Sequence, residues 1–243
     1  MNKKNTSLGT VLVTGGGKRI GKAIAIDLAS QGYSIALHHH TSHTEAQKVQ
    51  SQIKAFGVQC EIFSCDLSDE FQTSRLMKHV HRKFPKLNLL INSASIFEKS
   101  SLLKGNLELF NRHLAVNLKA PLILSRDFAR ICQKGQIINI LDTNVVKNKT
   151  SHAAYLLTKK ALLELTYMSA VELAPRIRVN GIAPGLILPP VNEKNNYLDR
   201  LAKNIPLQKK GDPKYIAQSV RFLIDNSYLT GQIIYVDGGE HLT

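Results

Sequence analysis

A tyrosine and a lysine four residues apart, Tyr155 and Lys159, form the pair in this sequence that is best suited to acid–base chemistry. A phenol has a pKa of about 10, so it is a weak acid–base group at neutral pH until a cation lowers that pKa. Residues four apart on a helix lie on one face, so Lys159 is placed to act on Tyr155, and both can face one ligand. The alternative is an ordinary surface pair on a helix.

An acidic residue, Asp142, lies thirteen positions before Tyr155 and ends a run of β-forming residues. A carboxylate beside a carbonyl oxygen that gains negative charge is repulsive, so Asp142 disfavours reduction of a ketone. A carboxyl group can instead bind an amino-pyrimidine edge or pass a proton towards a ring nitrogen. The sequence therefore favours reduction of a C=N bond. The alternatives for Asp142 are a solvated acid at a strand end and an inactive descendant of an enzyme.

A glycine-rich turn, TGGGKRIG at residues 14–21, connects the first β-forming run to a helical pattern. Glycines let the backbone turn tightly and approach a phosphate, and the N-terminus of the next helix supplies free N–H groups. Alone, such a turn indicates only a strand-to-helix connection, but after the first strand of a βα series it predicts a dinucleotide site. The expected cofactor contacts in this turn are Gly15, Lys18, Arg19, Ile20 and Gly21.

The end of the second β-forming run, LHHHTSHTE at residues 37–45, bears on the choice of cofactor. A site specific for NAD places a carboxylate there to bind the ribose 2′-hydroxyl. This chain has no acid before Glu45, and Lys18 and Arg19 add positive charge, so NADPH is the predicted cofactor. The expected contacts to its 2′-phosphate end are Arg19, His40, Thr41 and Ser42.

The elements that must position these residues alternate regularly along the chain. Runs rich in β-branched and aliphatic residues predict seven strands, at 10–15, 33–39, 60–66, 87–93, 136–141, 177–184 and 231–239. Helical patterns lie between them, at 20–30, 44–56, 70–83, 110–132 and 152–173. Such alternation predicts an α/β fold: a doubly wound, Rossmann-type parallel sheet with helices on both faces. Ligands then belong at the carboxyl ends of the strands.

Composition narrows the remaining classes. The 243 residues contain no linker-like stretch, and 43% are hydrophobic, so one domain over residues 1–243 is expected. Three cysteines without zinc-like spacing indicate free thiols and a reducing compartment, so a cytoplasmic location is expected. No metal site is expected at His38, His39 and His40, because adjacent residues on a strand point to opposite faces.

The net charge of +14 is compatible with nucleic acid, a membrane surface or an anionic substrate as a partner. Nucleic acid is disfavoured because no recognition motif accompanies the scattered basic residues. A membrane is disfavoured because no apolar run approaches the length that spans a bilayer.

Several ordered motifs together resemble the short-chain dehydrogenase/reductase family over nearly the whole chain. They are the TGxxxxxG turn, CDLSD at 65–69, INSAS at 91–95, Asn117, the Tyr155/Lys159 pair, APG at 183–185 and YLTGQIIYVDGG at 228–239. The resemblance implies that Asn117 holds a water in a proton relay, that Lys159 binds the nicotinamide ribose, and that the protein is a homotetramer. The further cofactor contacts that it implies are Asp66, Leu67, Asn92, Ser93, Ala94, Tyr155, Lys159, Pro184 and Gly185.

Within that family the chain resembles the pteridine reductase branch, which includes dihydromonapterin reductases that also reduce dihydrofolate. That branch has an aspartate at the position of Asp142, where most family members have a serine. LHHHTS resembles its His-x-His-Arg-Ser segment, with Thr41 replacing the arginine, and Phe97 matches an aromatic residue that stacks the pterin against nicotinamide. A buried core position is the alternative for Phe97. The substrate contacts that the resemblance implies are Arg19, Ser95, Phe97, Asp142, Tyr155 and Leu186.

The predicted activity is NADPH-dependent reduction of a C=N bond in a dihydropteridine, with Tyr155 and Asp142 supplying the proton through ordered water. Arg19 is expected to contact both cofactor phosphate and pterin. Dihydrofolate, dihydromonapterin and dihydrobiopterin remain open as substrates. The alternatives are a carbonyl reductase of the same family, acting on 3-oxoacyl groups or sugars, and a noncatalytic protein that binds NADP(H) or associates with nucleic acid.

Overall fold

Within residues 8–190 and 196–243, which the computed structural model describes, seven parallel strands form a single sheet in the order β3-β2-β1-β4-β5-β6-β7. The strands are β1 (Thr10–Val13), β2 (Ser34–His39), β3 (Cys60–Ser64), β4 (Leu87–Asn92), β5 (Gly135–Ile140), β6 (Ile177–Pro184) and β7 (Ile233–Val236). The predicted Rossmann-type fold is therefore confirmed.

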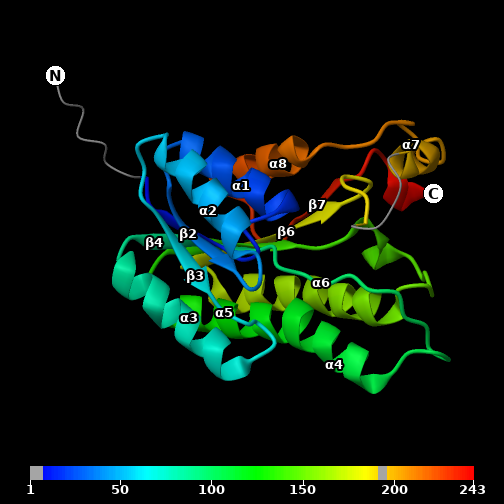
Figure 1. The fold of residues 1–243 in the computed structure, drawn as a ribbon, viewed down its shortest axis with the longest axis horizontal. Helices are drawn as coiled ribbons and strands as arrows, with labels where there is room; N and C mark the ends of the chain where they lie inside the picture. The colour runs from blue at the N-terminus through cyan, green and yellow to red at the C-terminus, as the bar shows by residue number, and fades with distance from the viewer. Residues whose placement is uncertain (1–7, 191–195) are drawn as a thin grey trace.

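Helices cover both faces of the sheet (Figure 1). In that view α1, α2 and α8 lie above the strands, and α3, α4, α5 and α6 lie below them. The helices of the described part are α1 (Arg19–Ser30), α2 (His43–Lys54), α3 (Glu70–Lys83), α4 (Leu107–Leu114), α5 (Ala120–Ile131), α6 (Ala153–Leu173), α7 (Tyr197–Ala202) and α8 (Pro213–Asp225). None of these helices is long and apolar enough to cross a membrane.

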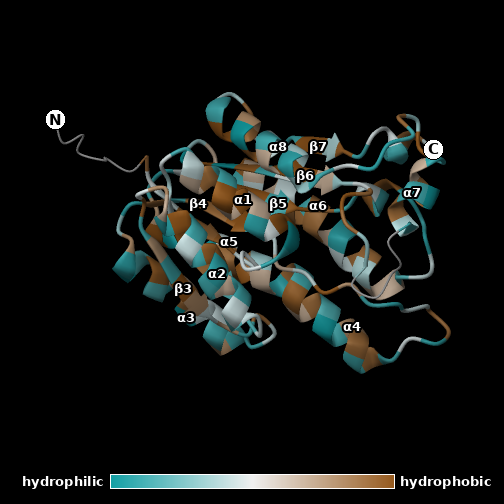
Figure 2. Ribbon diagram, turned by 45° about the horizontal axis from the view of Figure 1, so that its top comes forward, coloured by the Kyte–Doolittle hydropathy of each residue, from teal (hydrophilic) through white to brown (hydrophobic). Residues whose placement is uncertain are grey.

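The two faces of the sheet carry separate apolar clusters. Val11, Val13 and Ile35 pack on the side of α1, α2 and α8, while Leu12, Leu90 and Ile137 pack on the side of α3 and α5. Strands that are buried on both faces are apolar at nearly every position, which explains the continuous apolar runs in the sequence. In Figure 2 brown and teal segments alternate along α2 and α3, because each helix buries only one face.

One helix predicted as continuous, residues 110–132, is three elements in the structure. Helix α4 begins earlier, at Leu107, because the side chain of Asn106 accepts a hydrogen bond from the N–H of Leu109 at 2.7 Å. A π-helical turn (Ala115–Lys119) follows, and α5 carries a proline in its first turn. π-Helical turns occur mostly at functional sites, and this one contains Asn117.

The chain order reverses between β1 and β4, which are neighbours in the sheet although two βα units separate them in sequence. The carboxyl ends of these strands carry the glycine-rich turn and the segment 93–97, and the ends of β5 and β6 carry Asp142 and Gly185. In open α/β sheets ligands bind in the crevice at such a reversal. The candidate residues from these four strands therefore lie together along the edge of the sheet that the carboxyl ends of the strands form.

Candidate active site

The tyrosine and the aspartate that the sequence singles out are in direct contact. Tyr155 lies in the first turn of α6, and Asp142 follows β5 and caps the 3-10 turn Thr143–Val146. The phenolic O–H of Tyr155 donates a hydrogen bond to Asp142 Oδ2 at 2.8 Å. Two residues thirteen positions apart thus form one acid–base pair.

Asn144 holds the other oxygen of the Asp142 carboxylate. Its backbone N–H donates to Asp142 Oδ1 at 2.8 Å, and its side-chain amide donates to the same oxygen at 2.7 Å. The sequence interpretation missed Asn144, although an aspartate with a donor two residues later is the pattern of an Asx turn. The carboxylate is therefore oriented before any ligand binds.

Lys159 is buried in α6 one helical turn beyond Tyr155, as the spacing predicts. Its Nζ donates to the backbone carbonyl of Ile140 at 2.7 Å and lies 5.8 Å from the centroid of the Tyr155 ring. Burial lowers the pKa of the Lys159 ammonium to about 8, although Asp142 opposes that shift. The ammonium group of Lys159 is thus hydrogen-bonded to the end of β5 rather than to the phenolic oxygen of Tyr155.

The pKa of Tyr155 differs from the sequence-based expectation. The spacing predicts that Lys159 lowers this pKa, but the structure gives a pKa raised well above the usual 10. Burial disfavours the phenolate, and the neighbouring Asp142 carboxylate both repels the phenolate and accepts the phenol's hydrogen bond. The expectation is corrected for this arrangement: the pair holds a neutral phenol against a carboxyl group.

Asn117 is fully buried in the π-helical turn and braces the segment after β4. Its Oδ1 accepts from the N–H of Ile96 at 2.9 Å and from Ser95 Oγ at 3.1 Å, and its Nδ2 donates to the Ile96 carbonyl at 3.0 Å. A longer contact joins Nδ2 to Thr158 Oγ1 at 3.3 Å. The predicted water-holding role is not tested by these contacts, which link Asn117 to the segment that carries Ser95.

Phe97 is not a core residue, since 47% of it is exposed. Its ring packs edge-on against Tyr155, with 4.7 Å between centroids. A second ring, His152, stacks on it at 4.2 Å with an interplanar angle of 10°. His152 escaped the sequence interpretation because its contact with Phe97 is long-range. Together Phe97, His152 and Tyr155 form a wall of three rings beside Asp142.

The glycine-rich turn has the geometry that a dinucleotide requires. Gly15 has a φ of +65°, and a Cβ there would lie 3.0 Å from the Cα of Ala94. At Gly21, in the first turn of α1, a Cβ would lie 2.4 Å from the carbonyl oxygen of Gly15. Only glycine fits either position, so the turn lies directly against the start of α1 and the segment after β4. These residues fit a nicotinamide dinucleotide.

His38 supports that turn from beneath, and the sequence interpretation assigned it no specific role. It is buried, its Nδ1 accepts from the N–H of Gly15 at 3.1 Å, and its Nε2 lies 3.0 Å from the Cys65 carbonyl. Because Nδ1 must accept, Nε2 carries the hydrogen, and the ring is neutral. Burial lowers its pKa to about 4. His38 thereby joins the ends of β1, β2 and β3.

The two basic residues of the turn point to different neighbours. Lys18 Nζ lies 2.9 Å from Glu45 Oε1 in the first turn of α2. Arg19 has a φ of +52° and donates to the carbonyl oxygens of Pro189 at 2.8 Å and Leu188 at 3.4 Å, in the segment after β6 that also carries Leu186. Arg19 therefore faces the segment after β6, where a substrate contact is predicted, and Lys18 faces the start of α2, where the adenosine end of the cofactor is predicted.

The remaining residues predicted at the adenosine end cluster around the ends of β2 and β3. His40 is exposed, and its Nε2 lies 3.7 Å from Asp66 Oδ2. Asp66 Oδ1 accepts from the N–H and hydroxyl of Ser68 at 2.8 and 2.7 Å, while Leu67 is buried in the core. Thr41 is exposed and Ser42 half-buried before α2, and Ile20 is half-buried at the start of α1.

Some of the ligand contacts predicted at the ends of β4 and β6 have side chains buried in the protein, and others are accessible. The side chain of Asn92 is buried and donates to Asn139 Oδ1 at 2.8 Å, so it contributes to the sheet rather than to a ligand surface. The N–H groups of Ser93 and Ala94 donate to Thr14 Oγ1 at 2.9 and 3.0 Å. Pro184 ends β6, and Gly185 and Leu186, both half-buried, begin the segment that follows it.

Comparisons with known proteins agree with this geometry. Residues 16–241 match the family model described as enoyl-(acyl carrier protein) reductase. The 3-oxoacyl-[acyl-carrier-protein] reductase FabG of Staphylococcus epidermidis is 31% identical over 250 residues, covering 96% of this chain and 99% of that protein. The solved structure of FolM alternative dihydrofolate reductase 1 from Brucella suis, in complex with NADP, has a TM-score of 0.93 and 37% identity, covering 97% of this chain and 96% of that one.

The fold and the Tyr155/Lys159 site are those of an oxidoreductase that works with a nicotinamide cofactor. The chain belongs to the short-chain dehydrogenase/reductase family. The family resemblance and the enzyme class predicted from the sequence are confirmed at this level. The Brucella suis structure and a solved blue fluorescent protein from a metagenomic library, which is a complex with NADPH, agree with the predicted cofactor. The latter is 28% identical with a TM-score of 0.90, covering 97% of this chain and 99% of that one.

Proposed function

We propose that this protein reduces a C=N bond of a dihydropteridine, with NADPH as the hydride donor. The observation that carries the proposal is the direct hydrogen bond of 2.8 Å between Tyr155 and the carboxyl group of Asp142. A carbonyl reductase needs neutral donors around an oxygen that gains negative charge, and a carboxylate opposes that charge. Reduction of C=N needs a proton at nitrogen instead, which a carboxyl–phenol pair can deliver.

The proton route uses the two contacts of the carboxyl group. Asn144 occupies Asp142 Oδ1, so Oδ2 is the oxygen that exchanges hydrogen with Tyr155. When Asp142 is protonated, its O–H donates to the phenolic oxygen, and the hydrogen of Tyr155 is free to pass to the substrate nitrogen. Bound NADPH would supply a hydride for the carbon, and with the proton from Tyr155 this would saturate the C=N bond. Tyr155 never becomes a free phenolate, which agrees with its raised pKa.

The ring wall supports a flat, nitrogen-rich substrate. Phe97 lies in the segment after β4, exposes 47% of its surface and contacts the Tyr155 ring edge-on. A pterin ring stacked there would lie next to the hydrogen of Tyr155. Arg19 reaches the loop 186–190, and Ser95 lies beside Asn117, so both can approach the edges of such a ring.

The residues that would hold the cofactor run along the edge of the sheet from β6 to β3. Gly15, Gly21 and the N-terminus of α1 accommodate the phosphates, Lys18 and Ser42 the 2′-phosphate, and Asp66 the adenine. Lys159 lies where the family resemblance puts the nicotinamide ribose. Lys18 and Asp66 are accessible at the surface, so an incoming cofactor can reach both.

A second function, reduction of a 3-oxoacyl thioester, is favoured by one observation. FabG of Staphylococcus epidermidis and the 3-oxoacyl-[acyl-carrier-protein] reductase of Synechocystis are each 31% identical to this chain. The identity to the Brucella suis FolM structure is higher, at 37%, and Asp142 argues against a ketone substrate. We therefore rank the pteridine activity first.

We also propose that the protein is a cytoplasmic homotetramer. Helix α6 buries Tyr155 and Leu162 on its inner side but also exposes apolar side chains on its outer side, with Met168 68% and Val171 83% exposed. Three buried free cysteines support a reducing compartment. Light scattering coupled to size-exclusion chromatography tests the assembly, and a monomer at micromolar concentration would contradict it.

The experiment that tests the function is a steady-state assay of NADPH oxidation with a matched panel of substrates. Dihydrofolate, dihydromonapterin and dihydrobiopterin represent the C=N class, and a 3-oxoacyl thioester and a simple ketone represent the carbonyl class. Turnover of a dihydropteridine that exceeds turnover of both carbonyl substrates supports the proposal. Turnover of carbonyl substrates alone would select the second function, and NADPH binding without any turnover would indicate a noncatalytic protein.

A further inference from the structure

The adenosine end of the cofactor site contains an acid that the cofactor preference does not explain. Glu45 is the third residue of α2 and lies in its first turn. Its Oε1 is 2.9 Å from Lys18 Nζ. Both side chains remain accessible, with 45% of Glu45 and 52% of Lys18 exposed. The pair therefore lies at the surface and can open when a ligand approaches.

The packing of the glycine-rich turn brings this pair beside Ser42, a predicted contact of the 2′-phosphate. A Cβ on Gly17 would lie 3.3 Å from Ser42 Oγ and 3.4 Å from the backbone nitrogen of Ala46. The turn thus lies directly against the start of α2, so Lys18, Ser42 and Glu45 share one small region. Ser42 is the residue before α2 and makes no side-chain capping bond there.

Apart from Lys18 and Lys48, the predicted contacts near this region have different neighbours or carry no charge. Arg19 donates to Pro189 and Leu188 at the substrate end. His40 is paired with Asp66 at 3.7 Å, and Thr41 carries no charge. Lys48 also acts on Glu45 electrostatically. Lys18 directly follows Gly17, which lies against Ser42, and among the described residues it is Lys18 whose ammonium group lies within ion-pair distance of Glu45.

We infer that Glu45 sets the strength of the preference for a 2′-phosphorylated cofactor, because it competes with the 2′-phosphate for Lys18. A phosphate that binds Lys18 must displace the carboxylate and remain close to its negative charge. Glu45 is ionised at neutral pH, since the hydrogen bond from Lys18 lowers its pKa. The preference for NADPH is then weaker than the cations alone would give. This inference rests on the proposed use of NADPH and is independent of the substrate.

The test measures binding of adenosine 2′,5′-bisphosphate and of 5′-AMP by isothermal titration at low salt, without any turnover. Glu45→Gln should tighten binding of the bisphosphate about threefold or more, the scale of one exposed ion pair, and leave 5′-AMP binding unchanged. The gain should shrink as salt is raised, because exposed charges are screened. Glu61→Gln is the matched control: Glu61 is also 45% exposed, it is 3.7 Å from Lys83, and the charge change is equal.

A double-mutant cycle identifies the mechanism. In a Lys18→Met background, Glu45→Gln should give less than half of its gain in bisphosphate affinity. Without Lys18 there is no ammonium group for which the carboxylate and the phosphate can compete. The inference is overturned if Glu45→Gln leaves bisphosphate binding unchanged or weaker, if Glu61→Gln gives an equal gain, or if the gain is undiminished without Lys18. A failed pteridine assay with these binding results intact would overturn the proposed substrate alone.

Discussion

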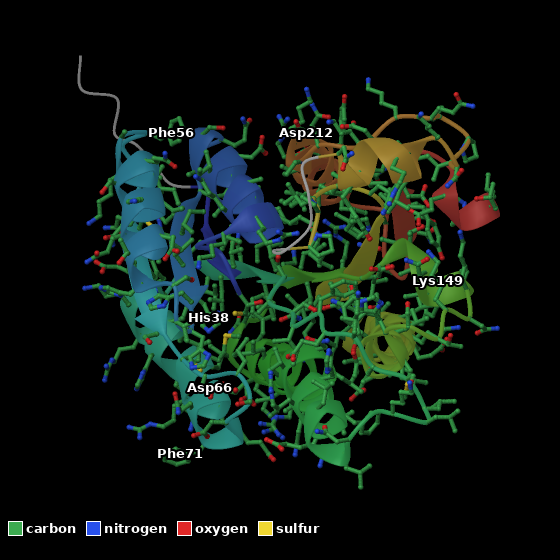
Figure 3. The ribbon with its side chains drawn as sticks, turned by 45° about the vertical axis from the view of Figure 1, so that its right-hand side comes forward. His38, Phe56, Asp66, Phe71, Lys149 and Asp212 are labelled. Carbon is green, nitrogen blue, oxygen red and sulfur yellow. The ribbon has the colours of Figure 1, made fainter. Side chains whose placement is uncertain are left out.

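The reaction centre and the adenosine end of the site lie at opposite sides of the sheet's edge and are built differently. In Figure 3, His38 and Asp66, near the predicted adenosine end, lie on the left, and Lys149, in the loop before α6, lies on the right. Tyr155 and Lys159 are buried and have fixed partners. Lys18 and Glu45 are about half exposed and form an ion pair with each other at the surface.

This difference teaches where large effects are to be expected. Burial of Tyr155 and Lys159 shifts both pKa values, because water no longer stabilises the charged forms. Exposed charges are screened by solvent and salt, so each contributes little. Chemistry is therefore concentrated in the buried part, while the exposed part adjusts the choice of cofactor by modest factors.

The largest effect is expected from Tyr155→Phe. The variant removes the proton donor and leaves Asp142 Oδ2 without its hydrogen bond, so kcat should fall by about a hundredfold or more. Stopped-flow measurement of NADPH oxidation with dihydropteridine checks this. NADPH binding by isothermal titration is the control, and it should change little. A kcat within a few-fold of the parent would remove Tyr155 from the mechanism.

The second prediction compares a buried histidine with an exposed one. The pKa of His38 in the folded protein is about 4, below its ordinary 6.5, so the unfolded chain takes up a proton between these values and the folded protein does not. The contribution of His38 to the free energy of unfolding is fully present above pH 6.5. It decreases as the pH falls and is lower by about 3 kcal/mol near pH 4.

Urea unfolding at pH 7 and pH 4.5 measures that loss. The decrease should be smaller in His38→Asn, which has no ring to protonate, than in the parent protein. His40→Asn, at an exposed position two residues on, is the matched control and should keep the parent's pH dependence. Equal pH dependence in the parent and His38→Asn would show that the buried ring does not titrate as inferred.

Asp142→Ser is expected to have the next largest effect. It restores the residue of ordinary family members, so kcat/KM for dihydropteridine should fall by about thirtyfold, while turnover of a ketone should not fall. The same assay with both substrates measures this change in preference. If pteridine turnover persists unchanged, Asp142 has no role in proton delivery and the main argument for the substrate fails.

The smallest effect at the reaction centre is expected from Phe97→Ala, because that side chain is partly exposed. Loss of ring stacking and apolar contact should raise KM for dihydropteridine by about tenfold, with little change in NADPH affinity. Leu107→Ala, at an exposed apolar position at the start of α4, is the control for general loss of surface. An unchanged KM, or an equal loss of NADPH affinity, would contradict the stacking model.

Much of the fold could be predicted because its signals are local. The seven strands are correct to within about three residues at their ends, since each is a short apolar run between turn residues. The helix at 110–132 was wrong in its continuity, because a π-helical turn depends on the contacts of Asn117 with the segment after β4. Local propensity carries no information about those contacts.

The site was predictable in its members and unpredictable in its connections. By itself the sequence determined the doubly wound fold, the glycine-rich turn and the presence of Asp142, Tyr155 and Lys159, because these depend on residue type and spacing along one chain. Only the tertiary structure decided that Tyr155 donates to Asp142 and that His38 supports Gly15. It also decided that Glu45 neutralises Lys18, because each of these contacts joins segments that meet only when the strands lie side by side.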